Sequence, residues 1–187
     1  MDADNLTPDT EYTVYILALD SKTGKVVKAH AYPSFAKTKP VGTIVPEIEL
    51  VGYYSGDEEA GSIFGQPDVT AGKAIAVVKY NVDPAATALY SGVLEGNGMD
   101  AVEYDDVYIN EMLKFYWDVV SLQQPYSFFV TTWQMEQTVF AYAEDANGGK
   151  GALGRFLLYP TAEEKGNIED LKALVAELNG ESKAASA

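Results

Sequence analysis

The sequence predicts a mostly β protein: an antiparallel sandwich with a helical insertion and a C-terminal amphipathic helix. Short runs rich in β-branched and aromatic residues alternate with polar positions, and Gly, Asn and Asp turns separate these runs. Only two segments show helical spacing of apolar residues. Short alternating strands bury their apolar sides by packing two sheets face to face, which favours a sandwich.

The first predicted element is a strand hairpin within residues 1–40. Residues 12–19 form an apolar strand, residues 20–24 (Asp-Ser-Lys-Thr-Gly) form a turn, and a second strand follows over residues 25–35. An isolated two-stranded hairpin is marginal in water. We therefore expect it to pack on the rest of the chain, to pair with another chain, or to fray. Self-association through the hairpin edge is one expected interaction.

A second hairpin, over residues 138–159, repeats the first at an offset of 125 residues, about one domain length. The matched positions include Thr13/Thr138, Val14/Val139, Tyr15/Phe140, Ala18/Ala143, Asp20/Asp145 and Gly24/Gly149. The first copy holds only the last part of the repeated unit. We therefore predict a truncated domain at 1–40, a sandwich at 41–160, and a C-terminal helix with a loose tail at 161–187.

Two strands and two helices are predicted between and after the hairpins. Residues 74–82 and 86–94 alternate as strands. A helical insertion near 105–120 is predicted from the acidic start at Asp105 and the stripe of Tyr108, Met112 and Phe115. The C-terminal helix has apolar residues at Ile168, Leu171, Leu174 and Leu178 and stops at Asn179-Gly180.

Composition excludes several functions. The chain has 28 acidic and 13 basic residues, a net charge of −15, which disfavours binding to nucleic acid and to anionic membranes. It has no Cys, so thiol nucleophiles, zinc ribbons and iron–sulfur clusters are excluded. No apolar run is long enough for a membrane span. Residues 2–5 form no secretory signal, so a signal or anchor is expected outside these residues.

Acidic residues form two groups that a metal ion could use. Asp145 and Asn147 suit either half of a calcium loop or a hairpin turn, and the turn is favoured because no Glu closes the loop at the required spacing. The second group suits either a hard cation or the start of a helix, where acids meet the helix dipole. It comprises Asp100, Glu103, Asp105 and Asp106. We expect no metal and no cofactor.

No residue is predicted to be catalytic. The single histidine, His30, lies near no Ser or Asp with triad spacing, and no pair of carboxylates stands out among the 28 acids.

Aromatic residues are concentrated in one stretch, which makes them the candidate binding residues. Nine of the 22 lie within residues 104–133. They can belong to the core or line a surface on which a sugar or a peptide stacks. The candidates for ligand binding are Trp117, Trp133, Tyr104 and Tyr126.

Strand alternation places Thr138, Phe140 and Tyr142 on the outer side of the sandwich. Two large rings on an outer strand require a cover. We predict that the helical insertion lies over them through Tyr108, Met112 and Phe115. If both rings were exposed instead, this side of the sheet would be the ligand platform.

Residues 6–12 (Leu-Thr-Pro-Asp-Thr-Glu-Tyr), followed by Val14, Ile16 and Ala18, resemble the start of the penultimate strand of a fibronectin type III domain. The resemblance includes the tyrosine corner of that fold at Tyr12. In the second copy Gln137 stands at the place of Tyr12.

Residues 46–160 resemble fibronectin type III-like modules of Bacteroidetes surface lipoproteins, through Tyr-Asn-Val-Asp-Pro at 80–84 and Phe-Ala-Tyr-Ala-Glu-Asp at 140–145. This resemblance implies a fibronectin-III/immunoglobulin-like sandwich in an exported, cell-surface protein without catalytic residues. The expected function is a binding or spacer module whose ligand is a glycan or a protein. The alternative is a carboxylate-dependent hydrolase of the glycoside hydrolase type, or its accessory domain.

Overall fold

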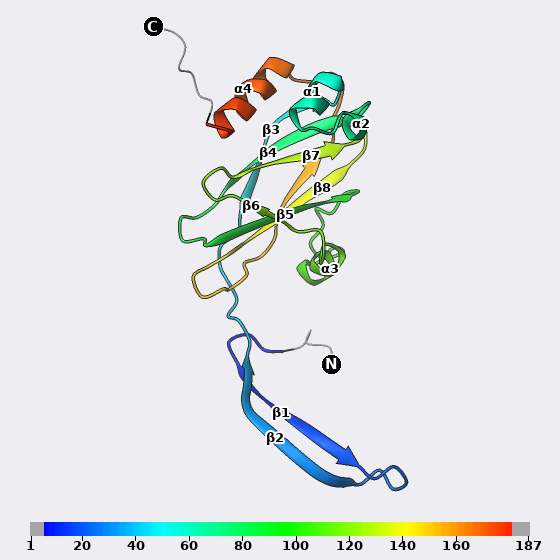
Figure 1. The fold of residues 1–187 in the computed structure, drawn as a ribbon, viewed down its shortest axis with the longest axis vertical. Helices are drawn as coiled ribbons and strands as arrows, with labels where there is room; N and C mark the ends of the chain where they lie inside the picture. The colour runs from blue at the N-terminus through cyan, green and yellow to red at the C-terminus, as the bar shows by residue number, and fades with distance from the viewer. Residues whose placement is uncertain (1–5, 181–187) are drawn as a thin grey trace.

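The computed structural model describes residues 6–180, without the side chains of Ser34, Phe35 and Glu58. The predicted loose tail, residues 181–187, therefore lies outside the described residues. The chain consists of a projecting hairpin and a layered body. In Figure 1 the hairpin lies below the body.

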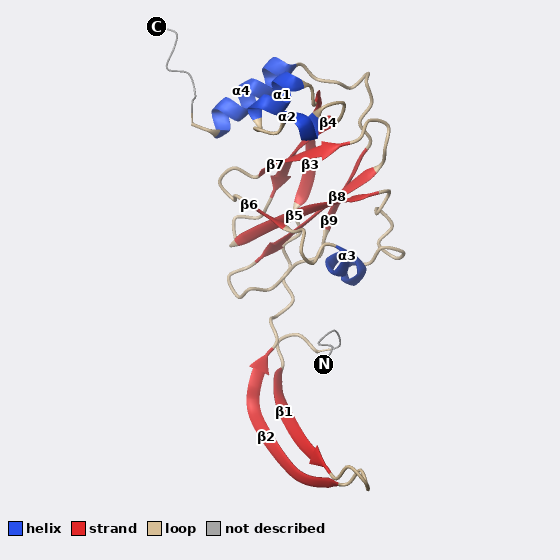
Figure 2. Cartoon of the chain, turned by 45° about the vertical axis from the view of Figure 1, so that its right-hand side comes forward, coloured by secondary structure: helices blue, strands red, loops and turns tan. Residues whose placement is uncertain are grey.

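The body is built on two antiparallel sheets that pack face to face, as predicted (Figure 2). One sheet has the order β3-β4-β7, with β3 at Glu47–Ser55, β4 at Ala74–Asn81 and β7 at Tyr126–Thr131. The other has the order β6-β5-β8-β9, with β6 at Asp118–Val120, β5 at Ala88–Glu95, β8 at Gln137–Glu144 and β9 at Gly154–Leu158.

The core lies between the two sheets and draws residues from both. It contains Ile48, Tyr53, Ala76, Val78, Tyr80, Leu89, Val120, Phe129, Val139, Ala141 and Leu158. The hydroxyls of Tyr80 and Ser91 hydrogen-bond to each other across the sheets. This pairing satisfies two polar groups that would otherwise be costly to bury.

Helices cover the outer side of the β3-β4-β7 sheet. They are α1 at Glu58–Ile63, α2 at Pro67–Thr70 and α4 at Ile168–Leu178, grouped at the top of Figure 1. Leu171 of α4 is fully buried in a cluster with Ile75 and Val77 of β4. The side chain of Asn167 caps α4 by accepting a hydrogen bond from the Glu169 amide.

The remaining helix, α3 at Asp106–Met112, forms a third layer on the outer side of β5 and β8. Phe140 is 0% exposed and Tyr142 is 9% exposed, so the predicted cover over the outer rings is confirmed. The predicted stripe is wrong: Ile109 and Leu113 make the contact instead.

The phase and length of α3 explain this correction. Tyr108 and Met112 are about half exposed, and Phe115 lies beyond the end of the helix, 85% exposed. The predicted helical insertion at 105–120 is also too long, because residues 118–120 form β6. The β-branched Val119 and Val120 pair there with β5, which competes with helix formation.

The hairpin consists of β1 at Glu11–Leu19 and β2 at Val26–Lys37. Its strands project away from the body and stay largely exposed (Figures 1 and 2). Of the three expected outcomes, packing on residues 41–187 is therefore not the one that the described residues show. At the start of β1 the Tyr12 hydroxyl accepts a hydrogen bond from the Thr7 amide at 2.5 Å. This bond joins the Tyr12 side chain to the backbone five residues upstream.

A closely packed linker joins the hairpin to the body. The buried linker residues Gly42, Ile44 and Pro46 alternate with exposed ones. The Gly42 amide donates to the Lys150 carbonyl at 3.0 Å. A Cβ at Gly151 would lie 1.9 Å from the Ile44 carbonyl oxygen, too close for any side chain.

The linker backbone also approaches two other glycines closely, one on each side of Gly151 in the chain. A Cβ at Gly149 would lie 2.9 Å from the Gly42 amide nitrogen, and one at Gly154 would lie 2.1 Å from the Pro46 carbonyl oxygen. We call Gly149, Gly151 and Gly154 the glycine seam. The seam lets the linker lie directly on the backbone of the body.

Candidate binding pocket

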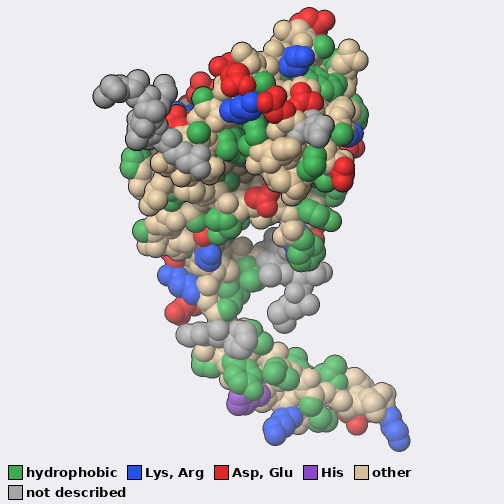
Figure 3. All heavy atoms as spheres, turned by 45° about the horizontal axis from the view of Figure 1, so that its top comes forward, with side chains coloured by type: hydrophobic (Ala, Val, Ile, Leu, Met, Phe, Trp, Pro, Cys, Tyr) green, Lys and Arg blue, Asp and Glu red, His purple; other side chains and the backbone are tan. Residues whose placement is uncertain are grey.

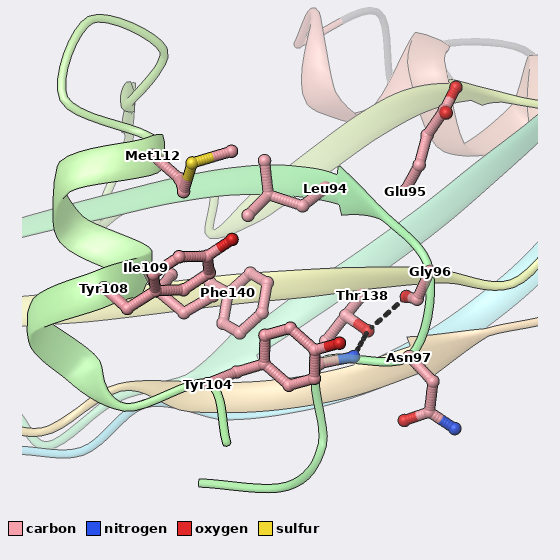
Figure 4. A pocket seen from close by; sticks show the side chains of 11 residues that line it. Leu94, Glu95, Gly96, Asn97, Tyr104, Tyr108, Ile109, Met112, Thr138 and Phe140 are labelled. Carbon is pink, nitrogen blue, oxygen red and sulfur yellow. Dashed lines mark hydrogen bonds between the residues drawn. The ribbon is translucent and has the colours of Figure 1, made fainter. Parts of the chain in front are cut away.

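A pocket of about 320 Å³ lies between α3, the outer side of β5 and β8, and the loop at residues 95–98 (Figure 4). Its lining is mostly apolar and aromatic. The lining residues are Leu94, Glu95, Gly96, Asn97, Gly98, Tyr104, Tyr108, Ile109, Met112, Thr138 and Phe140. Concave, apolar sites with a few polar groups are where proteins commonly hold ligands.

The helix side of the pocket is positioned by its capping residue. The Asp105 carboxylate accepts a hydrogen bond from the Tyr108 amide at 2.8 Å, which confirms the predicted helix start. With this phase, Ile109 packs on the sheet while Tyr108 and Met112 border the pocket.

The acidic residues before α3 also organise the backbone. Asp100 accepts hydrogen bonds from the Val102 and Glu103 amides, at 2.8 and 3.3 Å, and these bonds lower the pKa of its carboxyl. Within residues 6–180, no group of three or more acidic or His side chains is arranged to hold a metal ion.

The floor of the pocket is tied together by Thr138. Its hydroxyl accepts from the Gly98 amide and donates to the Gly96 carbonyl, both at 2.8 Å, as the dashed lines in Figure 4 show. A Cβ at Gly98 would lie 2.6 Å from the Phe140 ring. Glycine at this position therefore lets the loop rest on the ring, and the floor is preorganised.

Polar groups inside the pocket come chiefly from two tyrosines. The rings of Tyr104 and Tyr108 are 5.9 Å apart between centroids. The negative charge of the Glu103 carboxylate raises the pKa of Tyr104 above its ordinary value. Glu95 supplies the one carboxylate of the lining, and Figure 4 shows its side chain pointing away from the rings. The pocket can thus accept an apolar group and offer tyrosine hydroxyls to a polar neighbour.

A lysine lies among aromatic rings beside this layer. The ammonium of Lys150 is 3.5 Å from the centroid of the Tyr142 ring and 5.3 Å from that of Trp117. It also donates to the side-chain oxygen of Asn110. Tyr90 stacks on Tyr142 at 4.7 Å between centroids. These contacts hold α3 and the turn after β8 together.

Lys150 makes the stability depend on pH. Burial lowers the pKa of Lys150 to about 8 from its ordinary 10.5, against the opposing effect of Asp106 and Glu144. Between these two values the unfolded chain binds more protons than the folded chain, so Lys150 makes the free energy of unfolding rise with pH. Burial raises the pKa of Tyr142 to about 12 from 10.0, which opposes this trend only above pH 10.

We therefore expect the free energy of unfolding of the wild type, relative to Lys150→Met, to increase between pH 8 and pH 10. Urea denaturation of both proteins across this range measures the difference. Parallel pH profiles would contradict the burial of the Lys150 ammonium.

The structure separates the four predicted binding residues into different clusters. Tyr104 lines the pocket, and Trp117 packs against Tyr142 nearby. Trp133 packs against the core between the sheets, and Tyr126 packs in the cluster on the outer side of the other sheet. Of the four candidates, Tyr104 alone therefore lines this pocket. Strand pairing, not sequence proximity, decides which side of which sheet each ring reaches.

Sequence reasoning missed Met112, Tyr108 and the loop at 95–98 as pocket residues. The N-cap at Asp105 was the available signal for the helix phase. No sequence signal showed where the loop would lie.

The Asp145 region is a turn. Its carboxylate accepts hydrogen bonds from the Asn147 and Gly149 amides, at 2.8 and 2.9 Å. These bonds are the side-chain-to-backbone contacts of an Asx turn. The residues of the suggested half calcium loop thus serve the β8–β9 connection.

In comparisons with known proteins, no protein-family model matches the chain and no curated protein matches it significantly. Within the described residues no helix has both the length and the apolar character needed to cross a membrane.

Proposed function

We propose that the chain belongs to an exported, cell-surface protein and that residues 46–160 form a non-catalytic, fibronectin type III-like binding module. The pocket beneath α3 is its binding site, and the favoured ligand is a protein that inserts an apolar or aromatic side chain. A glycan is the second candidate.

Strand order supports the fibronectin-III/immunoglobulin-like part of this proposal. Among the seven body strands β3–β9, the first, second and fifth form one sheet, and the fourth, third, sixth and seventh form the other. This division is the one found in fibronectin type III sandwiches, whose strands connect in the Greek-key manner. The tyrosine corner at Tyr12 supports the same assignment for the hairpin.

The lining of the pocket carries the binding proposal. Leu94, Met112 and the rings of Tyr104, Tyr108 and Phe140 surround the space, on a floor held by Thr138. Burying an apolar side chain there removes its surface from water, which is favourable by about 25 cal/mol of free energy per Å² of apolar surface. Sugar recognition needs more hydrogen-bonding groups, while Glu95 and Asn97 point away from the rings in Figure 4. A protein side chain is therefore favoured over a glycan.

The positions of carboxylates support a non-catalytic role. Glycoside hydrolysis commonly uses two carboxyl groups that flank the scissile bond. The pocket lining holds Glu95 alone, and nearby Asp106 is committed to an ion pair with Arg155 at 2.7 Å. This arrangement supports a binding module over a carboxylate-dependent hydrolase.

Peptide and glycan arrays probed with the wild type and with Tyr108→Ala test the site. We expect wild-type binding to peptides with apolar anchors and a loss of about 10-fold or more in Tyr108→Ala. Phe115→Ala is the matched control, because Phe115 is an exposed ring outside the pocket lining. Equal binding by wild type and Tyr108→Ala would overturn the site. Binding to the glycan array alone would assign the second ligand class, and release of sugar products would contradict the non-catalytic role.

A further inference from the structure

The β1–β2 hairpin repeats the β8–β9 hairpin in its sequence, and both hairpins are antiparallel. In the first hairpin Val14 lies opposite Tyr32 and Ile16 lies opposite His30. In the second, Val139 lies opposite Phe156 and Ala141 lies opposite Gly154. Val14 corresponds to Val139 and Ile16 to Ala141. At the offset of 125 Tyr32 corresponds to Leu157, whereas Val139 lies opposite Phe156, so the pairing of the second hairpin is shifted by one residue relative to the first.

The environments of the two hairpins differ sharply. Val139, Phe140 and Ala141 of β8 are each 0% exposed, because the facing sheet covers one side and α3 covers the other. The corresponding Tyr15 and Ile16 of β1 are 64% and 59% exposed. Figure 3 shows hydrophobic side chains exposed along the projecting hairpin. β1 thus carries apolar residues on both sides, as a covered strand does, without a cover.

The two edges of the hairpin also differ. Exposed edge strands commonly carry Lys or Pro, which oppose pairing with another strand. β2 carries Lys28, Pro33 and Lys37, and it corresponds to β9, which is one of the two edge strands of its sheet. β1 has neither Lys nor Pro, and it corresponds to β8, which pairs with β5 on its other edge. The free edge of β1 is therefore suited to pairing.

We propose that β1 and β2 are the last two strands of a sandwich whose other strands come from a neighbouring module of the same kind. The equivalent of β5 pairs antiparallel with β1, and the equivalent of the β3-β4-β7 sheet covers Val14 and Ile16. Residues 1–40 have five acidic and five basic side chains, so an acidic module is not repelled by them. The inference does not rest on the binding pocket. The linker on the glycine seam would then hold the two modules at a fixed angle.

The test extends the full chain with a copy of its own residues 47–130, placed directly before Leu6. Residues 41–46 are left out because Val26 stands where their close packing needs Gly151. The offset of 125 makes residue 131 equivalent to residue 6, so the copy lacks the strands that β1 and β2 would replace, together with α4. Hydrogen exchange followed by mass spectrometry then compares β1 in the parent and extended chains. We expect exchange of the β1 amides to slow by about 100-fold or more, towards that of β8.

Two controls make the test specific. A chain extended by residues 41–160 carries a complete sandwich, so its β1 should exchange as fast as in the parent. The shorter extension with Val14→Asp and Ile16→Asp should show no slowing, because two carboxylates cannot enter the core.

Several results would overturn the proposal. One is fast exchange of the β1 amides in the shorter extension although its copied residues are folded. The same holds if the copied residues of the shorter extension stay unfolded whereas those of the longer extension fold. Another is β1 protection equal to that of β8 in the monomeric parent, which would show a self-sufficient hairpin. Concentration-dependent protection in the parent that the shorter extension does not remove would assign the edge to a second copy of the chain instead.

Discussion

Phe140→Ala is expected to lower the free energy of unfolding by about 3–5 kcal/mol. The Phe140 ring is 0% exposed and fills the space between β8, α3 and the loop at Gly98. The guanidinium of Arg155 also lies 5.4 Å from its centroid. Truncation removes these contacts and leaves a cavity under the third layer. Urea denaturation followed by both fluorescence and circular dichroism measures the loss.

The matched control is Phe115→Ala, the same change at a ring that is 85% exposed. Its free energy of unfolding should stay within about 0.5 kcal/mol of the wild type. Similar losses in the two variants would contradict the placement of α3 over Phe140.

Gly151→Ala is expected to have the second largest effect, a loss of about 1–3 kcal/mol with local release of the linker. The new Cβ would lie 1.9 Å from the Ile44 carbonyl oxygen. Backbone cannot move aside as a flexible side chain does, so the linker must leave its place or the β8–β9 turn must distort. Limited digestion with elastase, which cleaves after small aliphatic residues, should then cut after Val41 in the linker faster than in the wild type.

Val45→Ala is the control for the linker, because Val45 is exposed between buried Ile44 and Pro46. It should leave both the cleavage rate and the stability close to the wild type. If Gly151→Ala were as stable and as resistant as Val45→Ala, the close packing of the linker on the glycine seam would be refuted.

The sequence predicted the antiparallel sandwich because each strand can be recognised from its own residues and from the turns beside it. Alternation of apolar and polar residues and Gly-containing turns depend on neighbouring residues alone. The same alternation identified Phe140 and Tyr142 as outer residues that need a cover, and the Asp105 cap marked the start of α3. These features were readable because each depends on spacings of a few residues.

The helix phase shows where local reasoning stops. Two apolar sets share helical spacing on α3: Tyr108 with Met112, and Ile109 with Leu113. Only the orientation in which α3 docks on β8 decides which set is buried, and the structure selects Ile109 and Leu113. For the same reason the sequence pattern predicts Tyr108 and Met112 as the cover over Phe140, whereas in the structure they border the pocket.

By itself, the sequence determined the fold class, the repeated hairpin and the absence of cysteine chemistry. The tertiary structure alone decided the pocket, the separation of Tyr126 and Trp133 from Tyr104, and the course of the linker. The pocket exists because the loop at Gly98 rests on Phe140, more than 40 residues away in the chain. Such contacts depend on backbone paths that meet only after both sheets have formed, and no local pattern of residues encodes that meeting.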